Sequence, residues 1–119
     1  MEVKRTERGW PGHFCGAHSC LFRRNTLLDS GIQKVVVSTV GGYRVLEDYE
    51  TLNASGAYYE TCAFEAISDG HYNDADTSQE ISFDSPWMVK DLSDDLGANN
   101  MHETVVEELM EKMYKGEID

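Results

Sequence analysis

Four side chains that can bind a soft metal ion lie close together near the N-terminus of this 119-residue chain. They are His13, Cys15, His18 and Cys20. Cys and His are the preferred donors to zinc, and a closed tetrahedral site would use all four. Structural zinc sites, however, usually pair two short ligand clusters separated by a longer segment. The spacing therefore disfavours a metal site, and we expect neither a metal nor another cofactor.

The same cluster could carry a nucleophilic cysteine. Cys15 or Cys20 would be the nucleophile, and His13 or His18 would be the base that activates it. Closeness in sequence does not provide catalytic geometry, however, and neither an oxyanion signature nor a third orienting residue can be identified. We therefore expect a protein that is not an enzyme. A small metal-binding or cysteine-dependent enzyme or accessory protein that uses the His13–Cys20 cluster is the alternative.

Two adjacent arginines, Arg23 and Arg24, lie in a segment that is expected to form a strand. Successive side chains of a strand point to opposite faces of the sheet. One guanidinium is therefore expected to form a buried ion pair while the other is exposed. An anion-binding site is the less favoured interpretation of the pair.

The apolar patterns along the chain predict an α+β fold that positions these residues. We expect an antiparallel sheet of about four strands, with a C-terminal amphipathic helix packed on one face. The expected strands cover residues 20–28, 34–40, 57–67 and 79–84. The first two strands are joined through Asp29-Ser30-Gly31, a short connection that suits a hairpin. Pro86 cannot donate to a strand ladder, so it should end the last strand.

The C-terminal helix has the clearest periodicity in the chain. Its apolar stripe is formed by Met101, Val105, Val106, Leu109, Met110 and Met113. Such a stripe normally faces the core. Asn100 is expected to cap the helix N-terminus and Gly116 to end the helix. The acids expected to point to solvent are Glu103, Glu107, Glu108 and Glu111.

Length and charge limit the classes of protein that this chain can belong to. One domain, residues 1–119, is expected at this size. The net charge of −12, from 22 acids and 10 bases, disfavours direct nucleic-acid binding, because phosphates would be repelled. No apolar run is long enough to span a membrane. The segment after Met1 lacks the apolar core of a signal peptide, so a cytoplasmic protein with reduced thiols is expected.

The charge is distributed unevenly along the chain. Residues 1–45 carry seven bases and three acids, whereas residues 46–119 carry three bases and nineteen acids. The two parts have net charges of +4 and −16, so one face of the protein should be strongly electronegative. Acidic surfaces keep proteins soluble, but they also steer a protein toward a basic partner. The acids expected to centre this partner-binding surface are Glu47, Asp48, Glu50, Asp74, Asp76, Asp94 and Asp95.

Several stretches of the chain resemble a family of small, largely uncharacterised proteins that phages and other bacterial mobile elements encode. The stretches are Arg8–Phe14, Cys20–Leu28, Val36–Gly41, Tyr58–Thr61, Phe83–Trp87 and Asn99–Glu103. In the pattern of this family His13 and Cys20 match, whereas Cys15 and His18 fall at positions usually filled otherwise. The resemblance implies either a polar site or a polar sheet core. The residues involved are His13, Cys20, Arg23, Arg24, Asn25 and Glu60.

The resemblance also implies a function. Small acidic proteins of mobile elements often resemble anti-defence factors, including anti-CRISPR proteins that occupy the nucleic-acid channel of a nuclease complex. Carboxylates can replace phosphates on a groove lined with Lys and Arg. We therefore expect an inhibitor that binds a basic host protein, such as a CRISPR effector complex, through its acidic face. The oligomeric state has no signal in the sequence.

Overall fold

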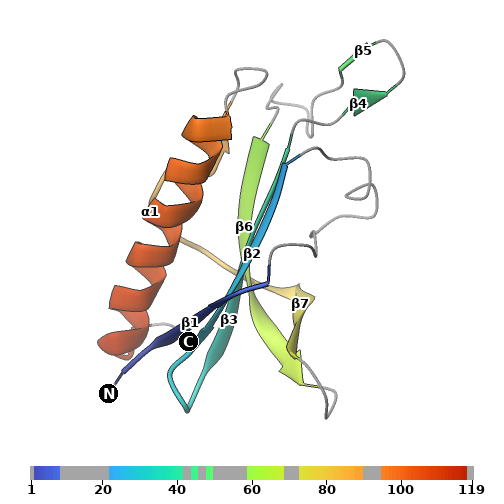
Figure 1. Cartoon of the computed structure of the whole chain (residues 1–119). Coiled ribbons are helices and arrows are strands. Elements are labelled where there is room, and N and C mark those ends of the chain that lie inside the picture. Colours follow the sequence, from blue (N-terminus) through green and yellow to red (C-terminus); the bar gives the residue numbers. More distant parts are fainter. Residues whose placement is uncertain are drawn as a thin grey trace.

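The computed structural model describes residues 2–8, 22–41, 44–45, 48–49, 59–68, 73–89 and 95–117. For residues 44–45, 48–49, 67–68 and 73–78 it describes the backbone alone. The fold is α+β, with one C-terminal helix packed against an antiparallel sheet (Figure 1). This arrangement confirms the predicted fold class.

Within the described residues the main sheet has six strands, which is slightly more than the four expected. They are β1 (Lys4–Glu7), β2 (Phe22–Asp29), β3 (Lys34–Gly41), β6 (Tyr59–Ser68), β7 (Asn73–Ile81) and β8 (Met88–Val89). The order is β1-β2-β3-β6-β7, and β8 also pairs with β6. A separate pair is formed by β4 (Arg44–Val45) and β5 (Asp48–Tyr49). All described pairings are antiparallel.

The hairpin of β2 and β3 forms the centre of the sheet. Its register pairs Asp29 with Lys34 at the turn and Phe22 with Gly41 at the other end. Gly31 has a φ of 87°, a conformation that side chains with a Cβ rarely adopt. The Asp29 carboxylate accepts a hydrogen bond of 2.8 Å from the Gly31 amide. The predicted hairpin is therefore confirmed, with its turn at residues 30–33, directly after Asp29 at the end of β2.

Three strands of the main sheet differ from the sequence prediction, because β1 and β8 were not predicted and β7 is displaced along the chain. β1 was not predicted, because its four residues are polar and all are exposed. β7 covers residues 73–81, whereas the expected strand covered residues 79–84. The acidic first part of β7 lacks the apolar alternation that identifies a half-buried strand. β1 and β7 lie at the two edges of the sheet. At an edge, pairing with the neighbouring strand can define a strand that has no apolar pattern.

Helix α1 runs from Asp95 to Tyr114. It begins before Asn100, so the prediction that Asn100 caps its N-terminus was wrong. Ala98 is buried in a cluster with Tyr59 and Met101, which extends the apolar stripe into the first turns. At the other end Gly116 has a φ of 71°. Its amide bonds to Met113 O and the next amide to Lys112 O, the pattern of a Schellman cap, so Gly116 ends the helix as predicted.

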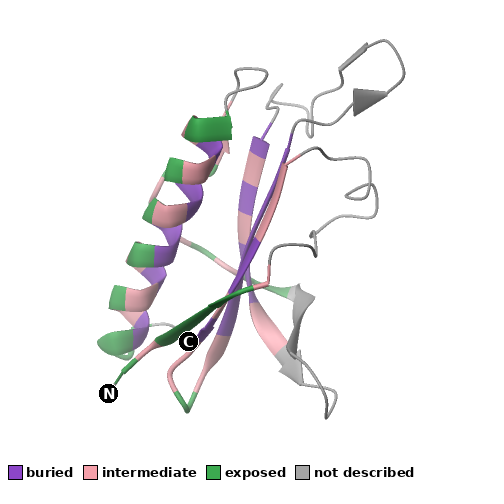
Figure 2. Cartoon of the chain, in the orientation of Figure 1, coloured by how far each residue is buried: buried purple, intermediate pink, exposed green. Residues whose placement is uncertain are grey.

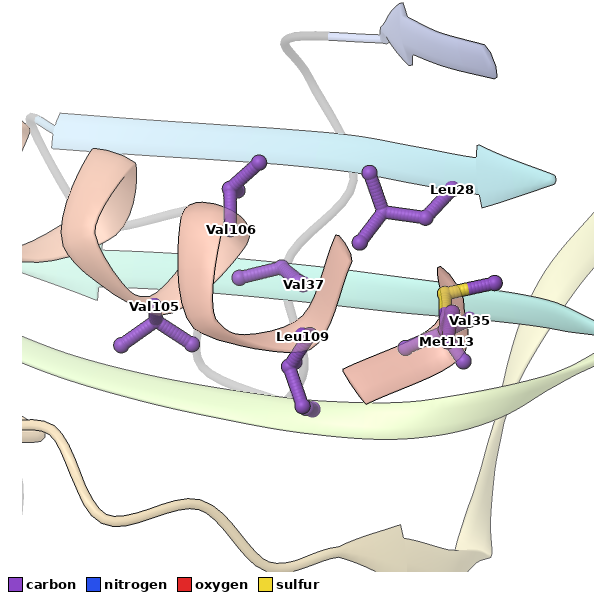
Figure 3. Close-up of a cluster of buried hydrophobic side chains, with 8 residues drawn as sticks. Leu28, Val35, Val37, Val105, Val106, Leu109 and Met113 are labelled. Atoms are coloured by element: carbon purple, nitrogen blue, oxygen red, sulfur yellow. The ribbon is translucent and has the colours of Figure 1, made fainter. Parts of the chain in front are cut away.

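The core lies between α1 and one face of the sheet (Figures 2 and 3). The sheet contributes Leu28, Val35, Val37 and Ala63, and the helix contributes Val105, Val106, Leu109 and Met113. The opposite face of the sheet is also buried at Val36, Val40 and Phe64. A central strand that is buried on both faces explains why the β3 sequence is a continuous β-branched run.

Glu108 does not point to solvent, contrary to the prediction. Its carboxylate accepts hydrogen bonds from the amides of Asp84, at 2.7 Å, and Ser85, at 2.8 Å, and from the Ser85 hydroxyl. Partial burial acts to raise the pKa of Glu108, but the hydrogen bonds from Ser85 and Asp84 outweigh it and lower the pKa to about 2. Glu108 therefore fastens the segment after β7 to the helix.

Replacing Glu108 by alanine should destabilise the protein. The two amides of Asp84 and Ser85 would lose a charged acceptor, and we expect Glu108→Ala to lower the free energy of unfolding by roughly 1–3 kcal/mol. Glu107→Ala is the matched control, because Glu107 is the exposed neighbour on the same helix, and it should change stability by less than about 0.5 kcal/mol. Urea unfolding measures both. Equal effects of the two substitutions would contradict the assigned role of Glu108.

Candidate functional site

A fully buried histidine lies on the side of α1 that faces the sheet. The side chain of His102 has 0% exposure, and each ring nitrogen has a partner. Nε2 lies 2.7 Å from the hydroxyl of Thr26 on β2, and Nδ1 lies 2.7 Å from the hydroxyl of Thr39 on β3. His102 follows Met101 and precedes Val105 by one helical turn, so it belongs to the buried face of the helix. The imidazole therefore connects α1 to two strands.

The hydrogen bonds continue on both sides of the imidazole. Thr39 bonds to Thr61 of β6 at 2.6 Å, and the strand register places these two threonines directly opposite one another. On the other side, the Thr26 hydroxyl donates to the carboxylate of Glu7 on β1. We call this series, Thr61-Thr39-His102-Thr26-Glu7, the His102 chain. It joins the helix to four strands of the main sheet.

Two arginines and two glutamates form ion pairs that link strands β1 and β2 to helix α1. Arg24 contacts Glu7 and lies 3.4 Å from Glu103. Arg5 lies 2.8 Å from Glu103 and 3.4 Å from Glu7. The four charges form a closed ring of alternating sign, which we call the ion-pair ring. Arg24 also donates to the Asn99 side chain at 2.8 Å.

The ion-pair ring corrects one sequence expectation. Glu103 was expected simply to face solvent, but its carboxylate binds Arg5, and this hydrogen bond lowers the pKa of Glu103. Arg24 is the arginine of the Arg23-Arg24 pair that reaches the helix side of the sheet. Its pairing with glutamates agrees with the expectation that one of the two arginines forms an ion pair. The pair is only partly buried, however, because Glu7 and Glu103 stay largely exposed, and Arg23 is half-buried instead of exposed.

Burial controls the protonation of His102. Desolvation, followed by the positive charge of Arg24, lowers the pKa of His102 to about 4. Glu7 and Glu103 act in the opposite direction, and Arg5 supports the lowering. The imidazole is therefore neutral at pH 7. Because it has no exposed surface, it is suited to connecting elements of the fold and not to reacting with a substrate.

The opposite face of the sheet holds a second polar group. Asn25 accepts a hydrogen bond of 2.7 Å from Arg8. The register places Arg23 opposite Val40, and Val40 opposite Glu60, in one row across the sheet. The Cys62 thiol donates to Glu60 at 3.6 Å, and burial together with the charges of Glu60 and Glu80 raises the pKa of Cys62. This cysteine is therefore a thiol at neutral pH.

The structure separates the residues of the expected polar site. Arg23, Asn25 and Glu60 share the face that points away from α1, whereas Arg24 lies on the helix face with Glu7 and Asn99. His13 and Cys20 lie outside the described residues, as do Cys15 and His18. In the described ranges, no group of three His, Cys, Asp or Glu side chains is placed to hold a metal ion.

Of the expected acidic surface, only one side chain is described. Asp95 starts α1 and accepts a hydrogen bond of 2.6 Å from the Tyr59 hydroxyl. Asp48 lies in β5, and Asp74 and Asp76 lie in β7, where the backbone alone is described. Glu47, Glu50 and Asp94 lie outside the described residues. Whether these acids share one surface therefore stays a prediction.

Sequence reasoning did not find the His102 chain. The available signal was a histidine within the register of the apolar helix stripe, together with threonines at inward-facing strand positions. A histidine in such a stripe has to find hydrogen-bond partners in the core, because a buried polar group without them costs free energy. The strand register that supplies Thr26, Thr39 and Thr61 can be read only from the structure.

Comparisons with known proteins give no family for this chain. No family model, curated protein or solved structure matches it. In the part of the chain that the structure describes, no helix has the length and apolar character needed to cross a membrane. The resemblance to mobile-element proteins therefore stays a prediction, and a function has to be argued from charge and from the described side chains.

Proposed function

We propose that this protein is a non-enzymatic inhibitor, encoded by a phage or another mobile element, that acts in the cytoplasm of the host cell. Its partner is a basic, nucleic-acid-binding protein of host defence, such as a CRISPR effector complex. The observation that carries the proposal is the net charge of −16 on residues 46–119, against +4 on residues 1–45. An electronegative surface of this size attracts a groove lined with Lys and Arg.

The described residues give two further arguments for binding over catalysis. Helix α1 carries five acids and one base, and its exposed acids, among them Glu107 and Glu111, project away from the sheet. The described histidine and cysteine are both ill-suited to chemistry on a substrate, since His102 is fully buried and the pKa of Cys62 is raised. These observations favour binding over chemistry at His102 and Cys62, whereas the His13–Cys20 cluster of the alternative lies outside the described residues.

The test compares two variants that have the same net charge. The variant Asp74→Lys/Asp76→Lys reverses two acids of the proposed surface, whereas Glu2→Lys/Glu117→Lys reverses two acids outside it. Purified effector complexes are titrated with each protein, and inhibition is measured in cells that carry the matching defence system. We expect the first variant to lose roughly tenfold or more in affinity and the control to lose little. The reason is that a charge affects binding mainly when it faces the basic surface of the partner.

Ionic strength provides the second part of the test. Binding by carboxylates that replace phosphates should weaken steeply when salt is raised from low to physiological concentration. Binding that is indifferent to salt, or equal losses in both variants, would overturn the acidic-surface proposal. Loss of inhibition in Cys15→Ser or Cys20→Ser, with the fold intact, would instead favour the cysteine-dependent alternative.

A further inference from the structure

The His102 chain has only one direction in which its hydrogen bonds can run. A carboxylate only accepts hydrogen bonds, so the single hydroxyl proton of Thr26 is directed to Glu7. Thr26 can then only accept from His102, which requires a proton on Nε2. The tautomer of a buried histidine is usually ambiguous, but here the carboxylate at the end of the chain determines it.

The remaining bonds follow from the neutrality of the imidazole. A neutral histidine has one donor and one acceptor nitrogen, so Nδ1 accepts from the Thr39 hydroxyl. The proton of Thr39 is then used, and Thr39 must accept from Thr61. The donors therefore run from Thr61 to Thr39 to His102 to Thr26, and the series ends on Glu7.

The strand that supplies Glu7 is the weakest part of this assembly. β1 has four residues, all of them exposed, and it lies at the edge of the sheet, paired with the last four residues of β2. Its Arg5 and Glu7 side chains belong to the ion-pair ring, in which Arg5, Glu7 and Glu103 are 34%, 44% and 40% exposed. On either side of the strand, Val3 packs against the core and Arg8 bonds to Asn25. Exposed ion pairs contribute little to stability. Short exposed edge segments open before the core does.

We propose that β1 can detach from β2 and that its presence or absence determines the tautomer of His102. The His102 chain connects the two events, because its hydrogen bonds run from Glu7 on β1 into the core. With β1 docked, Glu7 holds His102 in the Nε2–H form. When β1 leaves, Thr26 is free to donate to Nε2, and the imidazole can take the Nδ1–H form and donate to Thr39. His102 loses the proton on Nε2 to water and receives one from water on Nδ1, so its charge does not change.

The two forms give the helix two ways of bonding to the sheet. In both of them each ring nitrogen keeps a threonine partner, so release of β1 does not leave the buried imidazole without a hydrogen bond. An element with two satisfied arrangements is what a conformational switch requires. Release of β1 also makes β2 the edge strand along residues 26–29.

NMR of protein labelled with ¹⁵N-histidine tests the direction of the chain. At pH 7 the wild-type protein should show His102 in the Nε2–H form. Glu7→Ala removes the carboxylate, and a measurable fraction of the Nδ1–H form should appear. Glu103→Gln is the matched control, because it removes a partner of Arg5 and Arg24 but leaves the bond from Thr26 to Glu7; its tautomer should stay as in the wild type.

Hydrogen exchange in the same samples tests whether β1 detaches while the rest of the sheet stays folded. Amides of β2 that pair with β1, and those of β1 itself, should exchange roughly 100-fold faster than the amides between β3 and β6, which open only with the whole domain. Glu103→Gln should accelerate exchange at β1 further. An Nδ1–H form in the wild type, an unchanged tautomer in Glu7→Ala, or β1 amides that exchange only with global unfolding would each overturn the proposal.

Discussion

Lowering the pH from 7 to 4 should remove up to about 3 kcal/mol of folding free energy through His102. The pKa of His102 is lowered from 6.5 to about 4 in the folded protein, and each pKa unit corresponds to about 1.4 kcal/mol. The unfolded chain binds a proton at His102 below pH 6.5, whereas the folded protein binds it only near pH 4. The contribution is therefore complete above pH 6.5 and is lost as the pH falls toward 4.

A variant that does not titrate isolates this effect from the other ionisable groups. His102→Gln keeps a side chain that can donate and accept hydrogen bonds but cannot take up a proton. Urea unfolding of both proteins at pH 7 and pH 4 gives the difference in pH dependence, which should be about 2–3 kcal/mol smaller in the variant. A variant with the same pH dependence as the wild type would show that His102 is not held neutral by burial.

The parts of the fold that sequence could predict are those specified by local apolar patterns. The stripe from Met101 to Met113 predicts the buried face of α1, and the run Val35–Val40 predicts a central strand. Strand β1 has no such pattern, because Lys4–Glu7 is defined by its pairing with β2 and by the ion-pair ring. The early start of α1 likewise depends on Tyr59, which packs on Ala98 from a distant strand.

The His102 chain lies beyond sequence prediction for the same reason. Its members come from five elements, β1, β2, β3, β6 and α1. Only the register between the strands places the threonine hydroxyl groups within hydrogen-bond distance of His102 or of one another. Sequence spacing did place Arg23 and Arg24 on opposite faces. It could not show that Arg24 would contact Asn99 and Glu103 on the helix. Long-range polar contacts require the tertiary structure.

Leu109→Ala should cause one of the largest losses of stability that a single core substitution produces here. Leu109 has 0% exposure and lies in the cluster between α1 and the sheet, with Val35 and Val105 among its members (Figure 3). Truncation removes buried apolar surface and leaves a cavity in a closely packed core. For a fully buried leucine this costs about 3–5 kcal/mol. A loss of that size is a large part of the total stability of a small domain.

The same helix contains the control for this substitution. Leu96 lies in the first turn of α1 and is 72% exposed, so Leu96→Ala removes the same atoms from a position that buries little surface. Alanine also favours the helix slightly over leucine, and the free energy of unfolding should change by less than about 0.5 kcal/mol. Urea unfolding at pH 7 compares the two variants. If both cost the same, α1 does not pack on the sheet through the face that contains Leu109.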